Sequence, residues 1–299
     1  MRDMQSAITK AAALVEAHQY IKRFENKLIV VKVGGSIMDD ADALKLLIGD
    51  VCFMDAVGMR PVIVHGGGKS ITEAMQKAGL EAQFVQGRRY TDERTLAIAE
   101  HVLVNEVNKT IVDTINNLDH CGIGLHTLAS NVVFGKRLFL TAQGQNGEPA
   151  RRIDIGFVGE VTQVNGALIR ALAEAEYIPV IAPIARDLAG EKLNINADSV
   201  AGHVAAALRA EKLILVSDTH GIRTEKDNAE SYAKSLTKEQ IDGLMQKRVI
   251  DGGMLPKVEA AITALEAGVS KVHIIDGRIP HSVLLEVYTN EGIGTEIML

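Results

Sequence analysis

Two glycine-rich turns follow two short apolar runs near the start of the chain, and this pairing constrains the fold most. The KVGG turn at 32–35 closes the apolar run 28–31, and the HGGG turn at 65–68 closes the run 62–64. Continuous apolar runs are typical of parallel strands that are covered on both faces. Each turn precedes a helical pattern, so glycine amides and a helix N-terminus can converge on one anion. The sequence therefore predicts adjacent strand–turn–helix units that bind a polyanion and a second substrate.

Neither glycine turn matches a standard nucleotide-binding loop. A Walker loop ending at Gly68-Lys69 requires a glycine five residues before Gly68, and Ile63 stands there. No GxGxxG pattern follows either apolar run, so a dinucleotide-binding site has no support. Taken alone, either turn could also be a tight turn without a ligand.

Composition narrows the classes of function. The net charge of -6 over 299 residues supplies no excess of cations for a nucleic-acid backbone, so we expect no nucleic-acid partner. No run approaches the roughly 18 apolar residues of a membrane-spanning helix, and the first residues lack a long apolar signal segment. We expect a cytoplasmic protein with no membrane partner, in which Cys52 and Cys121 are buried, reduced thiols.

Apolar runs alternate with helical patterns along the chain, which predicts an α/β fold with a mostly parallel sheet and helices on both faces. A helix is expected over 92–117 and a last strand over 284–288. Two lobes should meet near 185–191. The helix predicted at 3–24 could cap its own domain or be exchanged between subunits.

Three polar positions in this pattern are candidates for chemistry. Lys32 lies inside an apolar strand, where its ammonium needs a cleft or a partner unless it snorkels to the surface. The segment NINAD at 194–198 presents Asn194, Asn196 and Asp198 at alternating positions, although Asp198 or Ser199 could simply cap a helix. Lys257 ends the glycine turn GGMLPK, and alone it could be a solvated helix residue.

An ordered set of motifs resembles the amino-acid kinase family along essentially the whole chain. The motifs are VVKVGGS, VIVHGGG, GRRYTD, VNK, GFVGEV, NINAD, VSD and GGMLPK. The resemblance implies a three-layer α/β/α sandwich with a mostly parallel central sheet. It also implies an intersubunit helix at 1–25 and one kinase domain at 26–299, with an acetylglutamate-binding lobe at 26–185 and an ATP-binding lobe at 186–299.

The branch of the family that the motifs resemble transfers a phosphoryl group from ATP, with Mg²⁺, to the side-chain carboxylate of N-acetyl-L-glutamate, in the second step of arginine biosynthesis. That carboxylate is ionised at neutral pH, so positioning and charge neutralisation suffice without a general base. The resemblance assigns catalysis to Lys32, Lys257 and Asp198, phosphate binding to Gly34, Gly35 and Gly66, and substrate binding to Gly67, Gly68, Arg89, Asn194 and Asn196. It assigns no side chain as a metal ligand.

The N-terminal helix and the C-terminal segment resemble the arginine-inhibited members of this branch. The resemblance implies a homo-oligomer, a hexamer built as a trimer of dimers, with arginine as inhibitor beside Lys212, His273, Glu286 and Gly292. Two other functions stay open: a non-catalytic arginine sensor, and a related kinase acting on another carboxylate or carbamate. Lys69 and Arg88 depart from the family pattern and leave substrate choice open.

Overall fold

The computed structural model describes residues 2–142, 151–289 and 292–299. Its α-helices are α1 (Arg2–Phe24), α2 (Ala41–Ala56), α3 (Gly68–Lys77), α4 (Glu93–Glu100), α5 (Lys109–Asn116), α6 (Gly166–Glu174), α7 (Ala197–Leu208), α8 (Lys238–Gln246), α9 (Leu255–Glu266) and α10 (Ser282–Tyr288). The 3₁₀ helices η1 (Gly35–Asp39) and η3 (Gly252–Met254) and the π-helix η2 (His101–Asn108) accompany them.

The strands are β1 (Leu28–Val33), β2 (Arg60–His65), β3 (Phe84–Val85), β4 (Arg88–Arg89), β5 (Gly122–Leu125), β6 (Val133–Ala142), β7 (Arg151–Val164), β8 (Ile178–Ile181), β9 (Ile184–Arg186), β10 (Lys192–Asn194), β11 (Lys212–Ser217), β12 (Ser235–Thr237), β13 (Lys271–Asp276) and β14 (Thr295–Met298).

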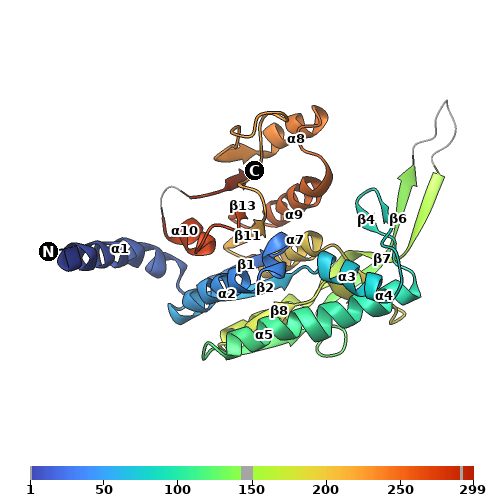
Figure 1. Ribbon diagram of the computed structural model, residues 1–299, viewed down its shortest axis with the longest axis horizontal. Helices are drawn as coiled ribbons and strands as arrows, with labels where there is room; N and C mark the ends of the chain where they lie inside the picture. The colour runs from blue at the N-terminus through green and yellow to red at the C-terminus, as the bar shows by residue number, and fades with distance from the viewer. Residues whose placement is uncertain (1, 143–150, 290–291) are drawn as a thin grey trace.

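The described residues build a central sheet with the strand order β12-β14-β13-β11-β1-β2-β8-β5 (Figure 1). Its pairs are parallel except for β13 with β14, so the prediction of a mostly parallel sheet is confirmed. Because Val33 lies opposite His65 in the β1–β2 register, both glycine turns leave the same edge of the sheet. This is the edge at which ligands bind in open α/β sheets.

Two hydrophobic clusters cover the two faces of the sheet. Alternate residues of β1 divide between them: Val30 packs in one cluster, while Ile29 and Val31 pack in the other. Helices α7 and α9 contribute buried residues to the first cluster, and α2 and α5 contribute to the second. The predicted placement of helices on both faces is therefore confirmed, and it explains why the strands read as continuous apolar runs.

A long antiparallel hairpin, β6–β7, extends from one side of the molecule (Figure 1). Its base joins β9 and β10 in a small closed barrel. The sequence indicated strands in this region but not the barrel. The barrel matters for the site because β10 carries Asn194 into position just before α7.

Two sequence expectations were wrong, and a third differs from the structure only in its local helix type. Residues 284–288 form the helix α10, because a five-residue apolar run is too short to show a helical or a strand period. The long helix expected at 92–117 is confirmed as a continuous helical run over 93–116, in which the middle part, η2, is π-helical. Cys121 is exposed, whereas Cys52 is buried as expected.

Helix α1 lies apart from the sheet and points away from the body of the molecule (Figure 1). Large apolar side chains along it are exposed, among them Leu14 at 68% and Val15 at 77%. Its C-terminal end does pack, since Phe24 is buried in the core. Within the part of the chain that the structure describes, no helix combines the length and apolar character needed to cross a membrane.

Close packing of α7 on α9 gives a stability prediction. A Cβ at Gly202 would lie 2.7 Å from the Ala260 carbonyl oxygen and 2.9 Å from its Cα, so the backbones would have to separate. We expect Gly202→Ala to lower the free energy of unfolding by about 1–3 kcal/mol in urea denaturation.

Gly243→Ala is the matched control, because Gly243 lies in helix α8 and a Cβ added there would have no atom within 4 Å. It should raise the free energy of unfolding by about 0.5–1 kcal/mol through its better helix propensity. Equal stability of the two variants would contradict the close approach.

Candidate active site

Three charged side chains from three elements meet at the carboxyl edge of the sheet. Lys32 of β1 places its Nζ 2.9 Å from Oδ1 of Asp198, in the first turn of α7. Lys257 of α9 approaches the other oxygen of Asp198 at 3.3 Å. Lys32 and Asp198 are each only 5% exposed. The structure thus brings together the three residues that the sequence assigned to catalysis.

Asp198 is ionised in this arrangement. Burial by itself would raise the pKa of its carboxyl group, but the ammonium groups of Lys32 and Lys257 hold the pKa below its ordinary value of 3.8. Two cations then share one anion, so the group retains a net positive charge beside the glycine turns. Such a charge favours an anionic ligand.

The glycine at position 34 makes room for Lys32. A Cβ at Gly34 would overlap both the Nζ and the Cε of the lysine, because the Lys32 side chain folds back across the turn that follows its own strand. The backbone of Gly34 is extended, so any residue could adopt its conformation. Space, and not backbone strain, is therefore what requires glycine here.

Asn196 fixes the start of α7. Its side-chain oxygen accepts hydrogen bonds from the amides of Asp198 at 2.9 Å and Ser199 at 3.1 Å. The sequence had allowed Asp198 or Ser199 as the cap, and the cap is Asn196. Because Asn196 caps the helix, the Asp198 carboxylate can turn toward the two lysines instead.

A cavity of about 250 Å³ opens beside this charged group. Most of the residues predicted to bind phosphate or substrate line it: Gly34, Gly66, Gly67, Gly68, Arg89, Asn194 and Asn196, together with Lys32 and Asp198. Lys257 reaches the cavity wall only through Asp198, and Gly35 begins η1 just beyond the wall. The cavity also has apolar walls, to which Phe84, Leu103 and Val158 contribute. Val158 lies within the motif GFVGEV, whereas Phe84 and Leu103 lie outside the motifs that the sequence showed.

Arg89 lies at the cavity wall and is held by the neighbouring helix. Its guanidinium donates to the Gly68 carbonyl at 2.7 Å and to the Thr72 hydroxyl at 2.8 Å, and it stacks over the Phe84 ring. Burial lowers the pKa of Arg89 below its ordinary value of 12.5. A guanidinium has five N–H donors, so donors remain for a carboxylate in the cavity.

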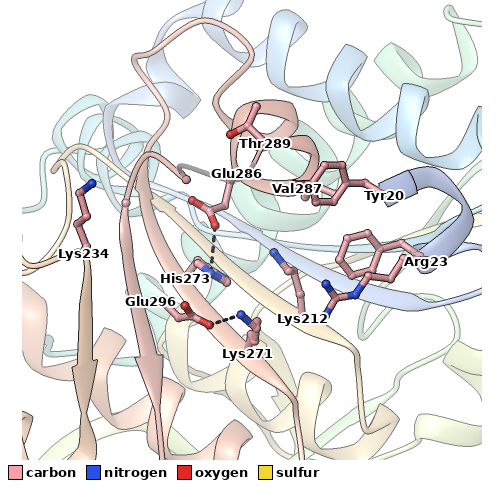
Figure 2. Close-up of a pocket in the computed structure, with 13 residues that line it drawn as sticks. Tyr20, Arg23, Lys212, Lys234, Lys271, His273, Glu286, Val287, Thr289 and Glu296 are labelled. Atoms are coloured by element: carbon pink, nitrogen blue, oxygen red, sulfur yellow. Dashed lines mark ion pairs between the residues drawn. The ribbon is translucent and has the colours of Figure 1, made fainter. Parts of the chain in front are cut away.

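A second cavity, of about 210 Å³, lies at the opposite edge of the sheet. Lys212 and Lys271 are the first residues of β11 and β13, so this cavity lies at the amino ends of strands whose carboxyl ends face the first site. Figure 2 shows Glu286 of α10 pointing toward His273 of β13, with an oxygen–nitrogen distance of 3.0 Å. All four residues predicted to surround an effector line it: Lys212, His273, Glu286 and Gly292.

The charges of the second cavity are mixed and partly desolvated. Burial, with help from Lys212 and Lys271, lowers the pKa of His273 to about 3, so the ring is neutral. Burial raises the pKa of Glu286 and lowers that of Lys212. Glu286 accepts a hydrogen bond from the Ile293 amide at 3.1 Å, which fixes the carboxylate at the cavity wall.

The N-terminal helix forms part of this second cavity. Tyr20 and Arg23 of α1 lie beside Lys212 in Figure 2. The Lys212 ammonium lies 5.5 Å from the centre of the Phe24 ring. The C-terminal end of α1 therefore forms part of the wall of a polar cavity, while the rest of the helix points away from the body of the molecule.

A parallel sheet with a cationic, glycine-lined cleft at its carboxyl edge is the arrangement of a phosphotransferase, and the chain belongs to the amino acid kinase family. The model of that family matches residues 27–276. Over nearly its whole length the chain is similar to proteins named acetylglutamate kinase. It is 42% identical to the one from Symbiobacterium thermophilum, over 98% of this chain and 99% of the relative. It is 43% identical to the one from Methanocaldococcus jannaschii, over 99% of this chain and 98% of the relative.

Solved structures agree on the fold. An N-acetylglutamate synthase from Neisseria gonorrhoeae matches with a TM-score of 0.83 at 23% identity, over 97% of this chain. The chain spans 63% of the length of that synthase. A carbamate kinase from Giardia lamblia matches with a TM-score of 0.63 at 14% identity, over 91% of this chain and 98% of the other.

The ion pairs of Asp198 give the second prediction. Asp198→Asn removes the anion between two cations and leaves Lys32 buried without its partner. We expect this variant to lose about 3 kcal/mol of unfolding free energy at pH 7 in urea denaturation. Asp113→Asn, which removes an exposed ion pair with Lys109, should change it by less than about 0.5 kcal/mol.

The pH dependence has a definite sign. Because the folded pKa of Asp198 lies below its unfolded value of 3.8, the stabilisation is present above pH 3.8 and is lost as the pH falls through the folded pKa. The difference between the wild type and Asp198→Asn should therefore shrink on acidification. A difference that is the same at acidic and neutral pH would exclude these ion pairs as its source.

Proposed function

We propose that the protein catalyses the ATP-dependent phosphorylation of the side-chain carboxylate of N-acetyl-L-glutamate, giving N-acetyl-L-glutamyl 5-phosphate. The observation that carries the proposal is the buried Lys32–Asp198–Lys257 group at the mouth of the glycine-lined cavity. The similarity to acetylglutamate kinases over nearly the whole chain supports this choice of acceptor.

The geometry suits phosphoryl transfer between two anions. The attacking carboxylate is already ionised, so the barrier comes from orientation and from charge repulsion. Lys32 and Lys257 neutralise charge on the phosphoryl group and on the leaving phosphate, and Asp198 holds both ammonium groups in place. The amides of the two glycine turns donate hydrogen bonds to phosphate and carboxylate oxygens without adding a flexible side chain.

The acceptor is held from the other side of the cavity. We assign Arg89 to its α-carboxylate, because the guanidinium lies at the wall with a fixed orientation. Asn194, whose amide donates to the Thr91 hydroxyl at 3.3 Å, keeps its carbonyl oxygen available for the N-acetylated amine. These contacts select an acylated amino acid over a smaller carbamate.

Magnesium accompanies ATP in this proposal. Among the described residues, no three His, Cys, Asp or Glu side chains gather in a group that could hold a metal ion. Bound with ATP, Mg²⁺ would keep several waters and would bind mainly through phosphate oxygens of the nucleotide. The ion would neutralise part of the charge on those phosphates, and the ammonium groups of Lys32 and Lys257 would neutralise a further part.

A coupled ADP-release assay tests the function. The wild type should release ADP with N-acetyl-L-glutamate, and much less with glutamate or N-acetyl-L-aspartate. Lys32→Ala removes a charge-assisted contact of the transition state and should lower kcat by roughly 10²–10³-fold.

Lys109→Ala, at an exposed helix position, is the control and should leave kcat unchanged. An unchanged kcat in Lys32→Ala would overturn the role of Lys32. Transfer to another carboxylate or to carbamate would favour the related kinase. A wild type that binds arginine but never releases ADP would favour the non-catalytic sensor.

We further propose that arginine, the end product of the pathway that N-acetyl-L-glutamyl 5-phosphate enters, inhibits the enzyme from the second cavity. The cavity combines a desolvated carboxylate, Glu286, with the ammonium groups of Lys212 and Lys271. A zwitterion with a cationic side chain can satisfy both signs at once. Glu286 is the partner for the guanidinium, because carboxylates bind guanidinium groups in bidentate fashion.

The same proposal gives α1 a partner. Its exposed apolar side chains Met4, Ile8, Leu14 and Val15 have the spacing of one helix face, which a second copy of α1 could cover. Interlaced helices of this kind would join dimers into a hexamer beside the arginine cavity, since Tyr20 and Arg23 of α1 line it. A monomeric mass for the full chain in analytical ultracentrifugation would contradict this assembly.

Glu286→Gln tests the arginine site. The variant keeps the shape of the side chain but loses the charge, so the arginine concentration for half inhibition should rise about 10–100-fold, the cost of a hydrogen bond to a charged group. Activity without arginine should persist, because Glu286 lies at the opposite edge of the sheet. Glu266→Gln, in an exposed ion pair with Lys238, should leave inhibition unchanged. If arginine inhibited both variants equally, the second cavity would not be its binding site.

A further inference from the structure

His65, in the second glycine turn, has no role in the mechanism described above, although it lies beside the site. It is the last residue of β2 and is 0% exposed. Its Nδ1 lies 2.9 Å from the carbonyl oxygen of Gly66, and its Nε2 lies 3.1 Å from Nδ2 of Asn108. A buried imidazole with both nitrogens engaged is fixed in orientation.

The partners of this ring determine where its proton lies. Nδ2 of Asn108 is also 2.9 Å from the Val180 carbonyl oxygen, which can only accept a hydrogen bond. Nδ2 must therefore donate, and Nε2 of His65 accepts from it. The ring proton is then on Nδ1, where the Gly66 carbonyl accepts it. The same tautomer follows from both ends of the chain of hydrogen bonds.

The imidazole is neutral. Its pKa is lowered to about 4, mainly by burial and also by His126 just beyond β5, although the hydrogen bond to Gly66 acts in the opposite direction. A neutral ring donates from one nitrogen only, as the hydrogen bonds require. The tautomer should therefore be the same across the neutral pH range.

The π-helix η2 supplies the other contacts of the turn. Asn108 is its last residue, and Leu103 lies five residues earlier, one π-helical turn away. A Cβ at Gly67 would lie 2.7 Å from Cδ2 of Leu103, so the helix presses directly on the turn. The Asn108 side-chain amide lies against Gly124 of β5, and a Cβ at Gly124 would overlap its Oδ1. Glycine at this position therefore leaves room for the amide.

The direction of the Gly66 carbonyl fixes the direction of the next amide. In a trans peptide the carbonyl of one residue and the N–H of the next point to opposite sides. The Gly66 carbonyl points to the buried imidazole, so the Gly67 N–H points away from that ring, and Gly67 itself lines the cavity, whereas His65 is not among its lining residues. Among the described residues no backbone carbonyl accepts from this N–H.

We propose that His65 and Asn108 are positioning residues that aim the Gly67 N–H at the carboxylate of the acceptor substrate. The inference rests on the proposed function, in which that carboxylate attacks ATP beside the second glycine turn. Asn108 sets the tautomer of His65, His65 holds the Gly66 carbonyl, and the Gly67 amide then has one orientation before substrate arrives. Pre-orientation of this kind lowers the barrier because no reorganisation is needed during transfer.

Two substitutions separate this role from simple packing. In His65→Asn the side-chain amide nitrogen takes the place of Nδ1 and can still donate to the Gly66 carbonyl. In His65→Gln the amide extends to the place of Nε2 and retains the contact with Asn108, but it loses the donor to Gly66. Both variants keep a polar amide in the same buried position, so thermal denaturation measures their common packing loss.

His65→Gln should lower kcat/KM for N-acetyl-L-glutamate about 10–100-fold, the cost of one oriented hydrogen bond to a charged group. The KM for ATP should not change, and His65→Asn should retain most of the activity. Equal losses in both variants, in proportion to their lowered melting temperatures, would overturn the positioning role and leave His65 a packing residue.

A measurement without substrate keeps the two proposals separate. Nitrogen-15 NMR of the wild-type imidazoles should show His65 as a neutral ring with its proton on Nδ1 from pH 6 to 8. In Asn108→Leu this single tautomer should be lost. A proton on Nε2 in the wild type would overturn the inference even in an active kinase. The expected tautomer in a protein that never phosphorylates N-acetyl-L-glutamate would instead refute the proposed function alone.

Discussion

The buried pair of Lys32 and Asp198 is the interaction on which the rest of the site depends. An ammonium in the middle of an apolar strand is costly unless an anion and a cleft are within its reach. Gly34 gives Lys32 the space to fold back, Asn196 starts α7 so that Asp198 faces it, and α9 adds Lys257. The elements β1, α7 and α9 are far apart in sequence, and the ion pairs of Asp198 with Lys32 and Lys257 join them at this site.

The two cavities lie at opposite ends of the same parallel strands. β11 pairs with β1 from the Ile29–Lys212 pair to the Val33–Val216 pair, so Lys212 and Lys32 lie on adjacent strands with one register. The strands β1 and β11 are fully buried in closely packed surroundings. An effector in the second cavity, as proposed above, would contact α1 through Tyr20 and Arg23 and α10 through Glu286, and of these two helices α1 has the exposed apolar face.

The sequence predicted the sheet and most of the polar site, because both leave local signals. Continuous apolar runs showed the parallel strands, and the lysine at 32 was conspicuous among Ile and Val. Tertiary packing decided the rest. The π-helix η2 contains the same residue types as an α-helix, so the sequence did not distinguish the two. The helix α10 stands where a strand was expected, because its apolar run is too short to show a helical or a strand period. The apolar cavity wall at Phe84 and Leu103 comes from elements that meet only in the fold.

The second glycine turn shows why three consecutive glycines follow a buried histidine. The Gly66 N–H donates to the Val33 carbonyl at 2.8 Å, so the two glycine turns are in direct contact, and a Cβ at Gly66 would still fit at 3.6 Å from that oxygen. At Gly67 a Cβ would collide with Leu103, whereas at Gly68 nothing lies within 4 Å. A side chain at position 67 would therefore have to displace the Leu103 side chain, whereas a Cβ at position 68 would enter open space. A turn without side chains presents only backbone donors to the cavity, and such donors need an external constraint to fix their direction. In this molecule the buried imidazole of His65 provides that constraint, because its hydrogen bond holds the Gly66 carbonyl and with it the peptide that carries the Gly67 N–H.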